Sequence, residues 1–83
     1  MQAQDILPDH LDTVERNGVV IRKGSVGAFL ANARTWCDPA SDPGARMRAE
    51  RDILDALPAL RALGLFEVLA IRDAALRDLV EAH

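Results

Sequence analysis

Residues 53–71, ILDALPALRALGLFEVLAI, form the longest apolar stretch of the chain. It is interrupted by Asp55, Arg61 and Glu67, by one proline and by one glycine. Its length matches a membrane span of about 20 residues, but each charged residue near the bilayer centre would cost about 2.5 to 3.5 kcal/mol. We therefore expect no membrane insertion, and we expect this stretch to be buried against the rest of the chain, a second copy or another protein.

The size of the chain limits how much stability that burial can give. With 83 residues and 49% hydrophobic content, the chain is sufficient for one small domain with a single core. A chain of this length buries only about 60% of its unfolded surface, so its stability is marginal. Cys37 is the only cysteine, and with His10 and His83 it gives no disulfide and no zinc-ligand spacing. Oligomerisation is the remaining way to add stability to the fold, and we predict a homo-oligomer, most simply a dimer.

The start of the chain and the charge balance restrict its location and partners. The first ten residues contain no basic stretch followed by an apolar one, so we predict no signal peptide. Together with the unpaired cysteine, this favours a cytoplasmic location. The net charge is −3, from ten basic and thirteen acidic residues. A mildly acidic chain is not typical of general nucleic-acid binders, and we do not expect nucleic acid as a partner.

The clearest local pattern predicts a β-hairpin over about residues 12–23. Asn17 and Gly18 are the favoured pair for a two-residue turn, and β-compatible residues flank them. In the resulting register, Val14, Val19 and Ile21 share one face, which we expect to be buried. The predicted fold class is therefore α+β: a single, small and mostly helical domain over residues 11–83, with the hairpin packed on about three helices. Residues 1–10 are predicted to be a flexible lead-in.

Periodicity predicts a first helix over about residues 25–37, with Ser25 as its N-cap. A loop over residues 38–42 follows, because the stretch DPASDPG contains only turn-forming residues and alanine. The apolar stripe of this helix, which we expect to face the core, consists of Val26, Phe29, Leu30, Ala33, Trp36 and Cys37.

A second helical segment is predicted over about residues 43–63, with Asp42 as its cap and Gly64 as its stop. Pro58 interrupts it, so the helix either kinks or ends near that residue. Residues 65–71 fit a strand, an irregular buried segment or the start of a last helix. A final helix over about residues 73–82 begins with Asp73 as its cap.

Two weak candidate binding sites follow from the pattern. Lys23, Gly24, Ser25 and Gly27 lie where the hairpin runs into a helix, a place where backbone N–H groups bind anions. The alternative is that they only turn and cap the chain, since they match no phosphate-binding loop motif.

The second candidate is an interaction patch for nucleic acid or an acidic partner, made of Arg34, Arg46, Arg48 and Arg51. No aromatic residues alternate with these arginines to stack bases. Helical spacing with nearby aspartates explains them as a solvated helix face, and we favour that interpretation.

No arrangement predicts catalysis, a cofactor or a metal ion. His10 and His83 lie near the ends of the sequence, where a general base is difficult to hold in place. Cys37 falls on the apolar stripe, which favours an inert core thiol. We therefore predict a non-enzymatic interaction or structural module that self-associates and that can also bind an unidentified protein. The alternatives are a small-ligand-binding protein, with an apolar pocket between the Val14–Ile21 face and residues 53–71, and a weak nucleic-acid-associated regulator that uses Arg46, Arg48 and Arg51.

Overall fold

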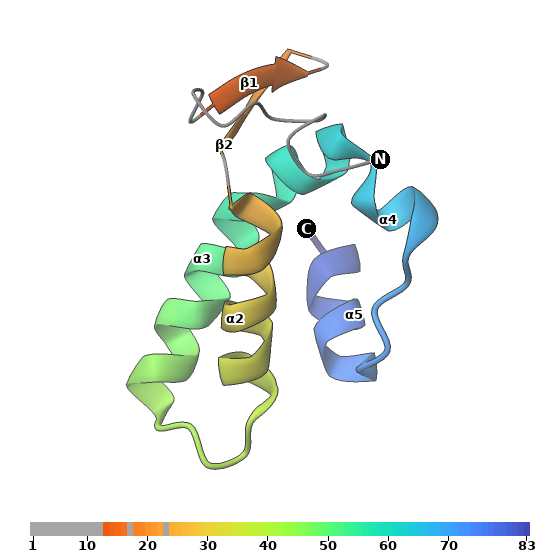
Figure 1. The fold of residues 1–83 in the computed structure, drawn as a ribbon. Coiled ribbons are helices and arrows are strands. Elements are labelled where there is room, and N and C mark those ends of the chain that lie inside the picture. The colour runs from red at the N-terminus through yellow and green to blue at the C-terminus, as the bar shows by residue number, and fades with distance from the viewer. Residues whose placement is uncertain (1–12, 17, 23) are drawn as a thin grey trace.

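Helices make up most of the structure (Figure 1). The computed structural model describes residues 13–16, 18–22 and 24–83. The predicted lead-in over residues 1–10, the turn residue Asn17 and Lys23 lie outside the described residues. In chain order, the elements are β1 (Thr13–Arg16), β2 (Val19–Arg22), α2 (Ser25–Cys37), α3 (Pro43–Leu63), α4 (Leu65–Val68) and α5 (Ala74–Glu81).

The predicted α+β class, with a hairpin packed on the helices, is wrong, because the described part of the chain is mostly helical and helices alone supply its hydrophobic cluster. β1 and β2 have four residues each and pair antiparallel, with Thr13 opposite Arg22. Two strands this short cannot form a layer with a core of its own. Ile21 of β2 is buried but does not belong to the cluster, and Val19 is half-buried. The side chain of Val14 lies outside the described residues.

α2 begins after Gly24, whose positive φ of 87° turns the backbone into the helix. Gly24 is the N-cap, so the prediction of Ser25 as N-cap is wrong by one position. The helix ends at Cys37, because Asp38 is extended before a proline.

The buried face of α2 is narrower than the predicted stripe. Phe29 and Trp36 are buried, whereas Leu30 and Cys37 are exposed. Each exposed residue directly follows a buried one, and one step along a helix turns the side chain by about 100°. Leu30 and Cys37 therefore lie beside the core-facing stripe and not within it.

α3 is one helix of 21 residues that continues through Pro58. Asp42 caps its start by accepting a hydrogen bond from the Ala45 N–H at 2.7 Å. Its end is closed by Gly64, whose φ is 88° and whose N–H donates to the last turn. Of the open alternatives for residues 65–71, the structure has the short helix α4 followed by extended backbone from Leu69 onward.

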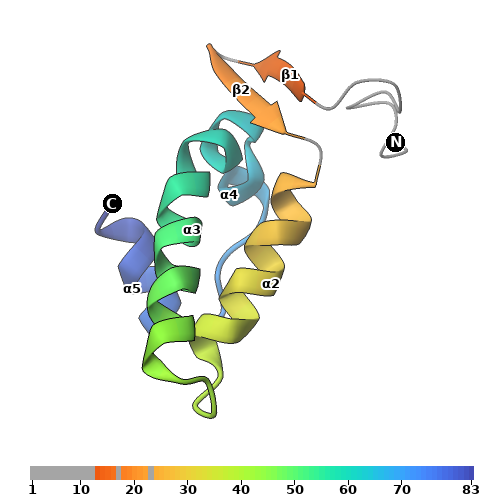
Figure 2. The same cartoon turned by 90° about the vertical axis from the view of Figure 1, so that its left-hand side faces the viewer.

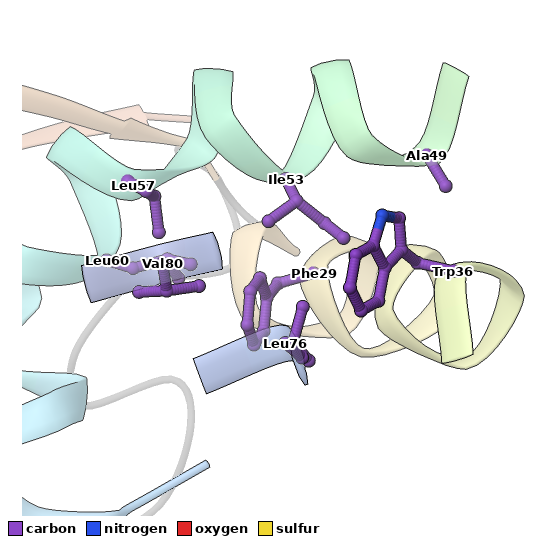
Figure 3. Close-up of a cluster of buried hydrophobic side chains, with 8 residues drawn as sticks. All are labelled: Phe29, Trp36, Ala49, Ile53, Leu57, Leu60, Leu76 and Val80. Atoms are coloured by element: carbon purple, nitrogen blue, oxygen red, sulfur yellow. The ribbon is translucent and has the colours of Figure 1, made fainter. Parts of the chain in front are cut away.

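The core lies where α2, α3 and α5 meet. α2 and α3 run side by side in opposite directions, and α5 lies against them (Figures 1 and 2). Ile53, Leu57 and Leu60 of α3 are at most 2% exposed. Figure 3 shows their side chains pointing toward those of α2 and α5. The full cluster consists of Phe29, Trp36, Ala49, Ile53, Leu57, Leu60, Leu76 and Val80.

α5 is capped at its start by its own N-cap residue and is joined to α3 at its end. Asp73 caps its start by accepting from the Leu76 N–H at 2.8 Å. At its other end, Arg61 of α3 donates to the carbonyl oxygens of Val80 at 2.9 Å and His83 at 3.1 Å. Because eight residues are too few for a stable isolated helix, these contacts and the burial of Leu76 and Val80 hold α5 in place.

Candidate functional site: an apolar groove beside α2

A groove with a volume of about 330 Å³ runs between α2 and the segment that links α4 to α5. We call residues 69–72, which connect these two helices, the strap. Apart from Arg72 and Asp73, every residue that lines the groove is apolar. One wall consists of Val26, Phe29, Leu30 and Ala33 of α2; residues 65–66 and 69–73 form the other, and Leu76 of α5 completes the lining.

The floor of the groove is part of the folded core. Phe29 and Leu76 line the groove and also belong to the buried cluster. The rings of Phe29 and Phe66 meet edge to face, with centroids 5.9 Å apart and an interplanar angle of 74°. Such a pair adds about 0.5 to 1.5 kcal/mol beyond burial of its area. The floor is therefore held by the same contacts that stabilise the fold.

The sides of the groove leave large apolar side chains in water. Leu30 on the α2 side is 51% exposed, and Leu69 on the strap is 59% exposed. Val68, which precedes Leu69, is 83% exposed. Met47 is 67% exposed as well, but it lies in α3 and does not line the groove. A concave apolar surface with exposed leucines on both sides is a feature of binding sites.

Two oppositely charged residues border the groove. Arg72 and Asp73 are consecutive residues that are both exposed. One oxygen of Asp73, Oδ1, accepts the α5 capping hydrogen bond. Arg72 and Asp73 therefore border a groove whose lining is almost entirely apolar.

The position of the groove differs from the predicted pocket. The prediction placed a pocket between the Val14–Ile21 face and residues 53–71. Only the last part of that segment lines the groove, and the facing wall is α2. The physical reason is that residues 53–63 belong to α3, whose apolar residues are already buried in the helical core.

The sequence analysis placed Leu30 on the core-facing stripe and did not single out Leu69 or Arg72. A signal for the exposure of Leu30 was present, because Phe29, Ala33 and Trp36 recur at helical spacing on a narrow face that excludes it. A signal for Leu69 was the apolar composition of residues 65–71, which exceeds what a four-residue helix can bury.

The arginine patch is spread over two helices. Arg34 lies in the last turn of α2 and Arg46 at the start of α3, so both are near the loop that joins these helices. Arg48 and Arg51 follow along α3, and all four side chains are exposed. The guanidinium carbon of Arg46 lies 4.5 Å from the centre of the Trp36 ring, which is a cation–π contact.

Trp36 is a core residue that reaches the surface through a polar contact. It is 8% exposed, in line with the core role that its place on the stripe predicts. Its indole N–H donates to Oε1 of Glu50 at 3.0 Å. Glu50 and Arg46 therefore hold the edge and the face of the indole ring, and Arg46 is less free to bind an acidic partner.

Of the predicted anion-binding residues, Gly24 and Gly27 are exposed and Ser25 is half-buried at the start of α2. A Cβ atom placed on Gly24 or on Gly27 would meet no atom within 4 Å. Lys23 lies outside the described residues, so the complete group is not defined by the structure.

Cys37 is exposed and not part of the core, which corrects the predicted buried thiol. Its pKa is raised, first by desolvation of the thiol and then by the carboxylate of Asp73, while Arg46 acts in the opposite direction. A raised pKa leaves less thiolate at neutral pH, and the thiolate is the reactive form. In the described ranges, no three histidine, cysteine or acidic side chains come together as a metal site would require.

Comparison with known proteins does not assign the chain to a family. No protein-family model, curated protein or solved structure matches this chain. Among the described residues, no helix combines the length and the apolar character that crossing a membrane requires.

Proposed function

We propose that this chain is a non-enzymatic protein-interaction module that self-associates through the groove beside α2. The observation that carries the proposal is the apolar lining of the groove, flanked by Leu30 and Leu69, each of them more than half exposed. Leaving this surface in water is unfavourable by roughly 25 cal/mol for each Å² of apolar area. An interaction that covers it is therefore favourable.

The small core supports the same conclusion. Eight buried residues form the hydrophobic cluster of the described part of the chain, and a domain of this size has little stability to spare. Association that buries more apolar surface would add to that stability by mass action. This is why self-association is the first function proposed for the groove.

The non-enzymatic part of the proposal is supported by the chemistry of the surface. The groove offers no nucleophile, and the raised pKa of Cys37 makes its thiol a poor one. We propose a cytoplasmic location as well, where a single exposed thiol stays reduced.

A small-ligand function is the second candidate, and one observation favours it. The groove volume of about 330 Å³ lies at the lower end of the range for ligand pockets. A nucleic-acid role through Arg46, Arg48 and Arg51 has less support, because Arg46 packs on Trp36.

The experiment is size-exclusion chromatography with light scattering across the micromolar range. Self-association predicts a mass that rises with concentration toward twice the 9.0 kDa of one chain. A constant mass of one chain at every concentration would contradict it. Native mass spectrometry of the same sample tests the second candidate, since a retained small molecule would add a defined mass to the monomer.

A further inference from the structure

We infer that a second hollow, on the other side of the strap, binds a small apolar carboxylic acid whose carboxylate lies between Arg61 and Arg77. This second hollow has a volume of about 300 Å³ and lies between the end of α3, the strap and α5. Its lining consists of Phe66, residues 69–71 and Val80, together with Arg61, Arg77 and Glu81. The inference concerns a different site from the groove beside α2 and does not depend on the proposed self-association.

The second hollow differs from the groove in the charged groups of its lining. Two arginines and one glutamate line it, and its other lining residues are apolar. The arginines come from different helices, because Arg61 lies in the last turn of α3 and Arg77 in the middle of α5. Since two positive charges meet one negative charge here, the second hollow favours an anion.

Hydrogen bonds to the lining place both guanidinium groups at the second hollow. Nη2 of Arg61 donates to the carbonyl oxygen of Val80 at 2.9 Å, and Nη1 of Arg77 donates to that of Ile71 at 3.4 Å. Val80 and Ile71 both line the hollow. These contacts restrict the arginines before a ligand binds, which reduces the conformational entropy that binding costs.

Both arginines have more donors than their described hydrogen bonds use. A guanidinium group has five N–H donors and no acceptor. The bonds of Arg61 to Val80 and His83 use two of its donors, and the bond of Arg77 to Ile71 uses one. Carboxylates accept charge-assisted hydrogen bonds from such groups, often two at a time. A carboxylate between the two arginines therefore meets donors on both sides.

The apolar part of the lining determines the rest of the ligand. Val80 is buried and Phe66 and Ile71 are half-buried, whereas both arginines are exposed. A ligand with a carboxylate at one end and hydrocarbon at the other keeps its charge near water and buries its apolar body. The volume lies at the lower end of the range for ligand pockets, which limits that body to a short chain or a single ring.

The first test uses hexanoate as the probe and hexanamide, which has the same chain and no charge, as its control. In NMR titrations of the ¹⁵N-labelled protein, hexanoate should shift the amide resonances of residues 66, 69–71 and 80. The dissociation constant should be in about the millimolar range, as expected for so small a ligand. Hexanamide should bind at least about tenfold more weakly, because it forms no charge-assisted hydrogen bonds. Equal binding of the two probes, or no shift of these amides in millimolar hexanoate, would overturn the inference.

The second test changes the two signs of charge separately. Arg77→Met should weaken hexanoate binding about five- to tenfold, because it removes one cation and leaves the contacts of Arg61 with α5 intact. Glu81→Gln should strengthen binding about two- to fivefold, since it removes the negative charge from the lining. Arg51→Met is the matched control, because it removes an exposed arginine of α3 that does not line the second hollow. It should change binding by less than about twofold.

A purely structural role of Arg77 predicts a different pattern. If Arg77 only supported the strap, Arg77→Met would weaken hexanoate and hexanamide binding equally, and Glu81→Gln would leave hexanoate binding unchanged. Either result would overturn the carboxylate site. Arg77→Lys keeps the positive charge and should retain most of the binding, and its failure to do better than Arg77→Met would argue against the role of charge. Circular dichroism of each variant verifies that the helices are retained.

Discussion

Removal of the Arg61 guanidinium group, a planar fork of N–H donors, should make α5 unfold locally more often than the rest of the domain. In Arg61→Met, the methionine keeps most of the apolar stem, and the two hydrogen bonds to the carbonyl oxygens of Val80 and His83 are lost. α5 has only eight residues and depends on its contacts with α3 and α2. We therefore expect the change to act locally on α5.

The magnitude follows from the two contacts. Hydrogen bonds to charged groups contribute about 1.5 to 3 kcal/mol when they are well buried. Here one bond is exposed and the other only partly buried. The Val80 carbonyl also accepts the backbone N–H of His83 at 3.2 Å. We expect a loss of about 1 to 2 kcal/mol for both bonds together, a factor of about 5 to 30 in the local opening equilibrium.

Native-state hydrogen exchange is the assay, because it reports opening of one segment separately from global unfolding. The amides of α5 should lose protection by this factor, while those of the middle of α3 change little. Arg61→Lys separates charge from geometry, since lysine keeps a positive charge near the end of α3 but lacks the planar fork. Arg77→Met is the matched control, because its contact with the Ile71 carbonyl is longer, at 3.4 Å.

Two results would refute the reasoning. Unchanged protection of α5 in Arg61→Met would mean that the fork contributes nothing in solution. Equal loss of protection in α3 and α5 would mean that α5 does not open as a separate unit.

Three further predictions concern the core and the single thiol. Ile53→Ala should lower the free energy of unfolding by about 2 to 5 kcal/mol in thermal or urea denaturation, because Ile53 is fully buried; Met47→Ala, at an exposed site, should change it little. Trp36→Phe should cost about 1 to 2 kcal/mol in the same assay, since the hydrogen bond to Glu50 is lost. The thiol of Cys37 should react more slowly with a disulfide reagent than a free thiol at mildly alkaline pH, and its rate should rise with pH, because its pKa is raised. Asp73→Asn should increase that rate, since the carboxylate is one cause of the raised pKa, and an unchanged or lower rate would contradict this cause.

The helix limits were predictable because they depend on residues with strong local preferences. Asp42 and Asp73 cap helices through their own side chains. Gly64 takes the positive φ that ends α3, and Asp38 before a proline ends α2. These effects act over one turn of chain, so a sequence shows them directly.

The fold class and the exposed faces were not predictable in the same way. The pattern around Gly18 favours paired strands, but whether two short strands become a layer depends on what they pack against. The exposure of Leu30 depends on the width of the face that α3 covers, which α2 alone does not reveal. Whether the helix continues through Pro58 was not predictable for a related reason. The sequence does not show whether packing on both sides of a proline holds a helix together.

The strap has empty space on both sides. A second hollow of about 300 Å³ lies on its other side, near Arg61 and α5, and both hollows share Phe66 and residues 69–71. Within the strap, Ile71 packs against the core and its carbonyl oxygen accepts from Arg77 at 3.4 Å, whereas Leu69 and Arg72 are exposed. The position of the strap would set the width of one hollow at the expense of the other. The strap therefore separates two hollows, and a molecule that bound in one of them and moved the strap would change the width of the other.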